Sequence, residues 1–183
     1  EGKPGNDVTL TIDANLQQYM AERLGAESAS AAVLDVETGA CLAIVSTPSF
    51  DPNSFIQGLT ERQWGELVSN RRAPLINKAI SGRYPPGSVF KLVVAMAALE
   101  AGVVDSGHRV TCLGHVQLGN RAFHCWRRGG HGPLSMVSAI TQSCDVYFYD
   151  LALAVGVNRI AEMAGRLGLG QTSGVDLPGG EGG

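Results

Sequence analysis

The chain has 183 residues, a length that fits one domain of ordinary size and is too short to favour two. Apolar residues make up 44% and charged residues 17% of the sequence, which excludes a disordered protein. The formal net charge of -3 shows no bias toward nucleic acid or an anionic membrane surface, so no nucleic-acid partner is expected.

The start of the sequence shows no targeting signal. Residues 1–10 have neither the basic nor the apolar region of a signal peptide. No window approaches the roughly 18 consecutive apolar residues of a membrane-spanning helix. Any export signal or membrane anchor is therefore expected outside this sequence.

The first predicted elements are a helix and two strands. Asp13 is a suitable N-cap for a helix over residues 14–24, and Gly25 can end it. Residues 30–47 alternate in polarity around a Glu-Thr-Gly turn, which predicts two strands joined by a tight hairpin. The buried face of the helix is predicted to consist of Leu16, Tyr19, Met20 and Leu24.

The rest of the chain alternates loops and helices. Residues 46–55 are expected to be loop, and Thr60 with Gln63 forms a capping-box pattern at the start of a short helix over 60–68. Residues 109–131 combine short extended pieces with glycine turns, so a small irregular hairpin region is expected there. Pro133 fits the first turn of a further helix. Helical patterns then cover 145–156 and 158–168, and the tail 167–183 is loop-like.

A serine and a lysine occur at the beginning of the apolar helix predicted within residues 84–102. Ser88 and Lys91 are three residues apart, so their side chains share one helical face. Apolar neighbours disfavour the charged form of the lysine amine and make a neutral, proton-accepting form accessible. A hydroxyl beside such an amine is a candidate nucleophile, and free N–H groups of the first turn could stabilise an oxyanion.

The same residues also have a plain structural interpretation. A serine at a helix start is often a cap, and a lysine near a helix end often extends its amine to solvent. A second serine, Ser143, lies between two predicted helices and is followed by Cys144 and Asp145. Serine at such a junction can equally be a helix cap. The order S-x-x-K and then S-x-D nevertheless follows the first two motifs of penicillin-binding proteins and class A β-lactamases.

Four stretches carry a wider resemblance. TLTIDANLQQ, AAVLDVETGACLAIVSTPSFDPNSF, NKAISGRYPPGSVFKL and TQSCDVYFYDLALAVG resemble successive landmarks of a class B penicillin-binding protein, most of all the elongation-specific penicillin-binding protein 2 type. The resemblance covers essentially the whole chain. It implies an α/β fold of the penicillin-binding transpeptidase (serine β-lactamase-like) class, with a helical subdomain and the first strands of the sheet.

The resemblance also implies an activity, a D,D-transpeptidase that cross-links peptidoglycan stem peptides ending in D-Ala-D-Ala and is acylated by β-lactams. It assigns Ser88 as nucleophile, Lys91 as general base and Ser143 as a proton-passing hydroxyl in the cleft. Asp145 completes the cleft, although many relatives have asparagine at this position.

One motif of the family is absent from this sequence. No K-T-G or K-S-G follows Asp145. In the family that strand binds the substrate carboxylate and completes the oxyanion hole. Residues 1–183 are therefore interpreted as part of a transpeptidase domain without its K-T-G strand, and as a segment that would be inactive alone.

Three cysteines and a histidine form a possible metal site. Cys112, Cys125, His131 and Cys144 supply a Cys3His ligand set that suits tetrahedral zinc, but their spacing alone leaves a Cys112–Cys125 disulfide open. The resemblance favours structural zinc, because penicillin-binding protein 2 relatives can hold zinc here. His115 and His124 are rival ligands, and Cys41 is expected to be a buried small apolar residue.

Other functions share these motifs. A β-lactamase or D,D-carboxypeptidase passes the acyl group to water, and a catalytically inert, zinc-stabilised module could sense β-lactams or dock a partner. The resemblance places the protein at the periplasmic face of the bacterial inner membrane, with its anchor outside this sequence. It also implies a partner, a glycan-polymerising elongation complex.

Overall fold

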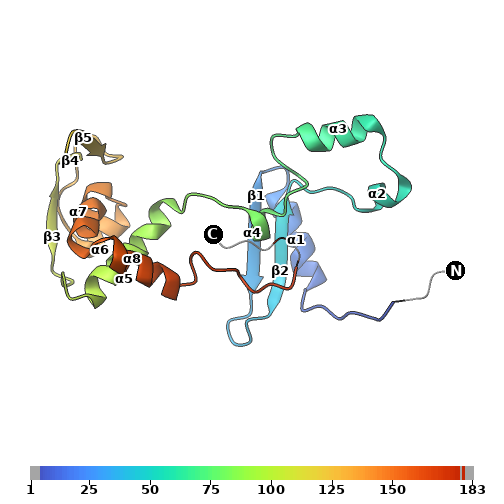
Figure 1. Ribbon diagram of the computed structural model, residues 1–183, viewed down its shortest axis with the longest axis horizontal. Coiled ribbons are helices and arrows are strands. Elements are labelled where there is room, and N and C mark those ends of the chain that lie inside the picture. Colours follow the sequence, from blue (N-terminus) through green and yellow to red (C-terminus); the bar gives the residue numbers. More distant parts are fainter. Residues whose placement is uncertain (1–4, 178, 180–183) are drawn as a thin grey trace. The chain divides into compact units, whose positions relative to one another are not determined.

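The computed structural model describes residues 5–177 and residue 179. These residues form two compact units, one of residues 5–83 with 174–177 and 179, the other of residues 84–173. Both units contain helices and strands (Figure 1), so the mixed α/β prediction is confirmed. Within the described residues the strands form three two-stranded antiparallel sheets.

The predicted hairpin is present in the first unit. β1 (Ala29–Leu34) pairs with β2 (Cys41–Thr47), with an irregular register at the last two residues of β1. In the connecting turn, Asp35 Oδ1 accepts hydrogen bonds from the backbone N–H groups of Glu37 and Thr38 and from the Thr38 hydroxyl. One carboxylate oxygen therefore organises the turn.

The predicted first helix, α1 (Ala14–Leu24), packs against β2. Asp13 caps its start as predicted, because the carboxylate accepts from the N–H groups of Asn15 and Leu16. The Gln17 side-chain amide makes two hydrogen bonds to the Ile44 backbone, of 2.7 and 2.8 Å, and so holds the helix to the strand. The predicted buried face is wrong at one position, since Tyr19 is 59% exposed while Leu16, Met20 and Leu24 are half-buried.

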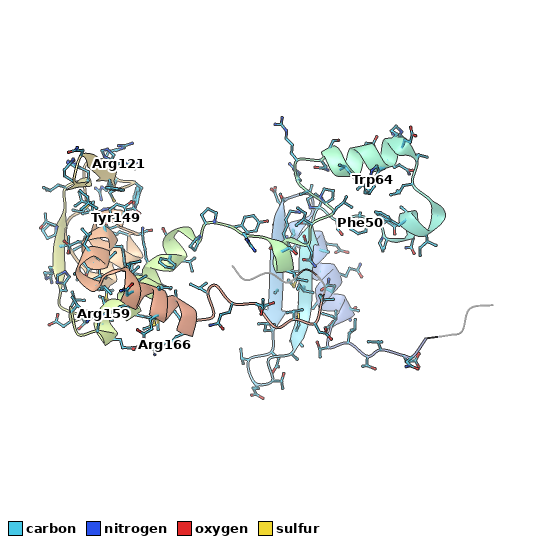
Figure 2. All side chains as sticks on the ribbon, in the orientation of Figure 1. Phe50, Trp64, Arg121, Tyr149, Arg159 and Arg166 are labelled. Atoms are coloured by element: carbon cyan, nitrogen blue, oxygen red, sulfur yellow. The ribbon has the colours of Figure 1, made fainter. Side chains whose placement is uncertain are left out.

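Two further helices follow β2. The loop prediction for residues 46–55 is wrong at both ends, because Ser46 and Thr47 lie in β2 and α2 (Asn53–Gln57) begins before residue 55. The Asp51 carboxylate accepts a hydrogen bond from the N–H of Asn53 and so satisfies a donor in the first turn of α2. Composition alone did not reveal this acceptor. The predicted capping box is confirmed at α3 (Glu61–Ser69). Phe55 of α2 makes edge-to-face contacts with Phe50 and with Trp64 of α3. Figure 2 labels Phe50 and Trp64 in this part of the chain.

A short helix, α4 (Lys78–Ser81), ends the helical part of this unit. Asn77 caps it by accepting a hydrogen bond from the Ala79 N–H. The sequence showed no periodicity here, since one helical turn is too short to produce any.

The second unit is built around the apolar helix α5 (Phe90–Glu100), which packs against both α7 (Asp145–Val155) and α8 (Val157–Arg166). Tyr147 and Leu151 of α7 are completely buried in the core of this unit. No helix among the described residues combines the length and apolarity needed to cross a membrane. The helices are η1 (Gly87–Val89), α5 (Phe90–Glu100), α6 (Met136–Thr141), α7 (Asp145–Val155) and α8 (Val157–Arg166).

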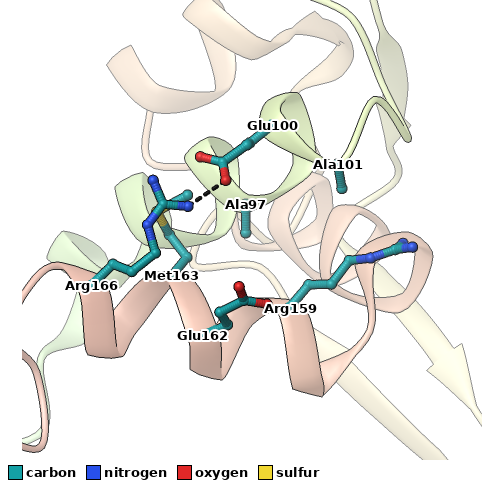
Figure 3. Close-up of a pocket in the computed structure, with 7 residues that line it drawn as sticks. All are labelled: Ala97, Glu100, Ala101, Arg159, Glu162, Met163 and Arg166. Carbon is teal, nitrogen blue, oxygen red and sulfur yellow. Dashed lines mark hydrogen bonds and ion pairs between the residues drawn. The ribbon is translucent and has the colours of Figure 1, made fainter.

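The contact between α5 and α8 combines an apolar and a charged part (Figure 3). Met163 of α8 is buried beside Ala97 of α5. At the exposed end, Arg166 pairs with Glu100. Met163 buries apolar surface, whereas an exposed ion pair of this kind contributes little to stability.

Two strand pairs make up the predicted irregular region. β3 (Arg109–Cys112) pairs with β6 (Gly132–Ser135), and β4 (His115–Leu118) pairs with β5 (Arg121–His124). The prediction that Pro133 begins a helix is wrong, because Pro133 lies in β6. Proline is tolerated in such an edge strand, where its missing N–H costs no ladder bond. The helix begins at Met136 instead, capped by Ser135.

Candidate active site and metal centre

The turn before α5 presents the first candidate pair. Ser88 is exposed and lies in the one-turn helix η1, which continues directly into α5. Lys91 is the second residue of α5, and its side chain is only 14% exposed. Its Nζ lies 5.8 Å from the ring centre of Phe148. The prediction that both residues lie at the start of the apolar helix is confirmed.

The junction of α6 and α7 presents the second pair. Ser143 has a φ of 50°, a left-handed conformation that ends α6. Cys144 is the N-cap of α7, and Asp145 is the first residue of that helix. The predicted position of Ser143 at the junction between two helices is therefore confirmed.

Hydrogen bonds join all four predicted residues. Ser88 Oγ lies 2.8 Å from Ser143 Oγ, which in turn accepts from Lys91 Nζ at 2.9 Å. Lys91 Nζ also donates to the Ser143 carbonyl at 2.8 Å and to Asp145 Oδ1 at 2.7 Å. These bonds connect Ser88 to Lys91 through the Ser143 hydroxyl.

The amine of Lys91 lies beside a carboxylate as well as beside apolar side chains. Its Nζ lies 2.7 Å from Asp145 Oδ1. Burial alone would raise the pKa of Asp145. The hydrogen bonds from Lys91 and from the Trp126 N–H outweigh burial and hold this pKa below its ordinary value.

Trp126 is a site residue that the sequence reasoning missed. Its backbone N–H donates to Asp145 Oδ2 at 2.9 Å, and its indole N–H donates to the Gln142 carbonyl at 3.0 Å. The available signal was its position directly after Cys125, a predicted metal ligand.

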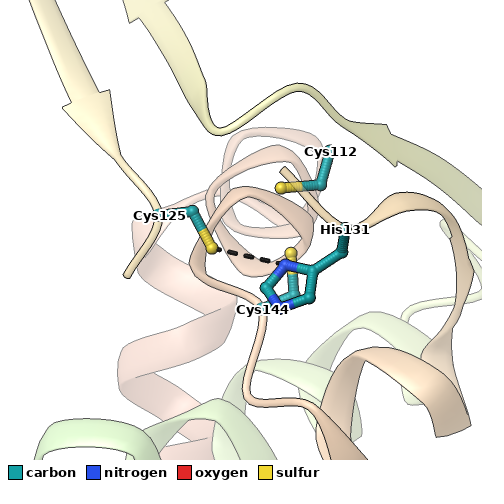
Figure 4. Close-up of side chains that lie close together, drawn as sticks. All are labelled: Cys112, Cys125, His131 and Cys144. Carbon is teal, nitrogen blue, oxygen red and sulfur yellow. Dashed lines mark hydrogen bonds between the residues drawn. The ribbon is translucent and has the colours of Figure 1, made fainter. Parts of the chain in front are cut away.

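The four predicted metal ligands lie together (Figure 4). One potential ligand atom from each residue lies within 4.8 Å of the others. The three thiols are at most 1% exposed, and His131 is half-buried. These four residues, Cys112, Cys125, His131 and Cys144, are called the Cys3His cluster below.

Close backbone contacts shape the loops around the Cys3His cluster. A Cβ on Gly114 would lie 2.1 Å from the Arg128 carbonyl oxygen, and one on Gly130 would lie 2.2 Å from the Cys112 carbonyl oxygen. Both glycines also have positive φ, of 92° and 77°. Only glycine allows the two loops to approach so closely.

The donor set fits a metal ion. All four cysteines of the chain are free thiols, so the alternative Cys112–Cys125 disulfide is not present. His131 Nε2 is buried without a hydrogen-bond partner, an unsatisfied group that calls for a ligand. Burial, reinforced by the neighbouring thiols, raises the pKa of Cys144 to about 12, a cost that a bound cation would reverse. The Cys3His cluster can therefore hold a metal.

The rival histidines lie outside this group. His115 and His124 face each other across β4 and β5, with ring centres 5.8 Å apart. Cys41 lies in β2 of the other unit, where its thiol contacts the Ala43 carbonyl. It is half-buried, so its predicted burial is wrong in degree.

Comparison with known proteins identifies the family. The model of the penicillin binding protein transpeptidase domain matches residues 29–183, a range that contains every candidate site residue. The chain is 38% identical over 175 residues to the peptidoglycan D,D-transpeptidase MrdA of Escherichia coli K12, covering 94% of this chain and 28% of that protein.

Solved structures agree with this match. The structure of Pseudomonas aeruginosa PBP2 in complex with WCK 5153 is similar with a TM-score of 0.84 and 41% identity, over 97% of this chain and 41% of that one. PBP2 of Helicobacter pylori in complex with MreC gives a TM-score of 0.85 and 30% identity, over 92% of this chain and 32% of that one.

The chain thus spans less than half the length of these relatives. The similarity to these proteins confirms both the resemblance to the penicillin-binding protein 2 type and the partial transpeptidase fold. The chain belongs to the penicillin binding protein transpeptidase domain family.

Proposed function

We propose that this chain forms the serine–lysine part of a peptidoglycan D,D-transpeptidase of cell-wall elongation. The observation that carries the proposal is the hydrogen-bonded network of Ser88, Ser143, Lys91 and Asp145. Because the chain spans a minor part of its relatives, we propose that a further part of the protein supplies the K-T-G strand.

In the proposed reaction Ser88 Oγ attacks the carbonyl between the two terminal D-alanines of a stem peptide. Its proton passes through the Ser143 hydroxyl to the neutral amine of Lys91, along the bonds described above. The Asp145 carboxylate, 2.7 Å from that amine, stabilises the ammonium as it forms. The carboxylate thus assists proton acceptance by the amine.

The acyl-enzyme forms when the carbon–nitrogen bond breaks. The departing D-alanine amine takes the proton back from Lys91 through Ser143. The amine of a second stem peptide then attacks the ester, and the bond between the acyl carbon and Ser88 Oγ breaks. Lys91 takes the proton of that amine and returns it through Ser143 to Ser88 Oγ, which restores the hydroxyl and the neutral amine. A hydrolase would instead accept water at this step.

The experiment is labelling of the full-length protein with a fluorescent penicillin. The parent should form a covalent adduct that persists, and Ser88→Ala should form none. Ser106→Ala removes an exposed serine of the same unit and should be labelled like the parent. An unlabelled parent would rule out acyl-enzyme chemistry and favour an inert module. Rapid loss of the label to water would favour a β-lactamase or carboxypeptidase.

We further propose that the Cys3His cluster binds structural zinc. Three thiolates and one imidazole form a closed tetrahedral set, which leaves no position for a reactive water, so zinc would stabilise the fold around Cys144. Support comes from the 4.8 Å grouping and the unsatisfied His131 Nε2. Intact mass under native conditions should show one zinc per protein, lost on denaturation with all thiols reduced.

The partners proposed for the whole protein follow from its relatives. A stem peptide ending in D-Ala-D-Ala and β-lactams would both be attacked by Ser88. Because PBP2 of H. pylori is found in complex with MreC, we propose that this protein also works within an elongation complex that includes a glycan polymerase. We place it at the periplasmic face of the inner membrane, with an anchor outside the residues given.

A further inference from the structure

Trp126 is an exposed side chain with well-defined polar contacts. It is 64% exposed, yet both its N–H groups donate to the segment that carries Ser143. Its ring meets the edge of His131 at a centroid distance of 5.2 Å, and its backbone follows Cys125 directly. One residue therefore contacts two ligands of the Cys3His cluster and the catalytic segment.

The indole bond acts on the peptide that precedes Ser143. The Gln142 carbonyl accepts the indole N–H at 3.0 Å, which fixes the orientation of the peptide group between Gln142 and Ser143. Ser143 has a left-handed φ of 50°, an uncommon conformation for serine, at the end of α6, where the Ser143 and Cys144 N–H groups bond to the Ile140 and Ala139 carbonyls. In this conformation the Ser143 hydroxyl reaches both Ser88 and Lys91.

The backbone bond acts on Asp145. Its Oδ1 accepts from Lys91 Nζ, and its Oδ2 accepts from the Trp126 N–H at 2.9 Å. With one donor on each oxygen the plane of the carboxylate is fixed, and so is the place at which it holds the lysine amine.

We propose that Trp126 is a positioning residue through which the Cys3His cluster holds Ser143 and Asp145 in the geometry that acylation requires. The inference rests on the transpeptidase function proposed above. A metal bound by Cys125 and His131 would hold both residues in place. Cys125 precedes Trp126 in the chain, and the His131 ring packs against the indole. Trp126 would then pass that constraint to Gln142 and Asp145, so the metal would act on the chemistry without touching substrate.

The test uses the zinc-loaded full-length protein and Trp126→Phe. Phenylalanine keeps an aromatic ring beside His131 and the backbone N–H to Asp145, and removes only the indole donor. We expect the acylation rate constant k2 for a fluorescent penicillin to fall about three- to tenfold, the range of one hydrogen bond. The binding constant K and the zinc content should not change.

Trp64→Phe is the matched control, because Trp64 is the other tryptophan of the chain and is also partly exposed. It lies in α3 of the first unit, so k2 should equal that of the parent. Trp126→Ala also removes the ring from His131. It should lower k2 further and speed the loss of zinc to a chelator, a readout that does not depend on acylation.

Each outcome decides a separate point. An unchanged k2 in Trp126→Phe overturns the inference. A rise in K with constant k2 also overturns it, since that result assigns Trp126 to substrate binding. If the unsubstituted protein is not acylated at all, the proposed function fails first; if it is acylated and Trp126→Phe matches it, only the positioning role fails.

Discussion

The two units contain the same unusual residue types with different partners. Lys78 of the first unit is 7% exposed, and its amine donates to the Ala73 carbonyl at 3.1 Å. Lys91 of the second unit has a similarly shielded amine that donates to a hydroxyl, a carbonyl and a carboxylate. Burial of a lysine is common to both units, so it is the set of acceptors that distinguishes a candidate base.

The cysteines and tryptophans of the two units also differ in their partners. Cys41 and Trp64 of the first unit contact a backbone carbonyl and another aromatic ring. In the second unit Cys125 lies among three other potential metal ligands, and Trp126 links it to Asp145. The first unit therefore provides matched controls for the proposed lysine, cysteine and tryptophan of the second.

The largest difference is expected between the two lysines. Lys91→Met removes the proposed base and leaves the Asp145 carboxylate without its cation. Acylation by penicillin should fall by about 10²- to 10⁴-fold, the usual range for loss of a general base. Lys78→Met removes one hydrogen bond to a backbone carbonyl, so acylation should be unchanged while stability falls slightly.

Acylation rates of the two purified full-length variants test this pair. Thermal unfolding of both variants must accompany the rates, because a misfolded protein is also unreactive. Equal loss of acylation in folded Lys78→Met and Lys91→Met would contradict the claim that only the lysine of the second unit acts as a base.

The next difference is expected between the cysteines. Cys125→Ser removes one of four proposed zinc ligands and should lower stability by roughly 4 kcal/mol or more, the range for loss of a structural metal. Cys41→Ser changes a half-buried thiol outside the cluster and should keep one zinc per protein. Metal analysis and denaturant unfolding of both variants measure the contrast; zinc retained in Cys125→Ser after dialysis against a chelator would contradict it.

Local chemistry made much of the fold predictable. The caps at Asp13 and Thr60 lie next to the helices they start, so short sequence windows contain all the information. The spacing of Ser88 and Lys91 was equally visible, because both residues lie at the beginning of one helical segment.

Several of the failures share one cause, which is contact between distant residues. Pro133 pairs with Thr111 across β3 and β6, and that register is invisible in the residues around the proline. The left-handed turn at Ser143 and the hydrogen bonds of Trp126 to the 142–145 segment likewise join separate elements. Sequence patterns therefore named the candidate site residues, whereas the contacts that position them depend on the three-dimensional fold.

The smallest expected effect lies in the first unit, at the turn between β1 and β2. Hydrogen bonds from Thr38 and Glu37 hold the pKa of the exposed Asp35 carboxyl below its ordinary value of 3.8. A depressed carboxyl pKa stabilises the fold above the ordinary value, and this stabilisation is lost as the pH falls through the folded-state pKa. Asp35→Asn keeps an acceptor oxygen but cannot ionise.

Asp35→Asn should therefore unfold at a slightly lower temperature than the parent at neutral pH, and the difference should shrink below pH 3.8 and vanish once the pH lies below the depressed folded-state pKa of Asp35. Glu37→Gln removes another acidic side chain from the same turn and keeps the backbone N–H of residue 37 that donates to Asp35. It should leave the pH dependence of the unfolding temperature unchanged. Penicillin acylation should be unaffected in both variants, because the turn belongs to the unit that carries none of the proposed chemistry. A change in k2 in Asp35→Asn would mean that the hairpin unit takes part in acylation, and the contrast between the two units would no longer hold.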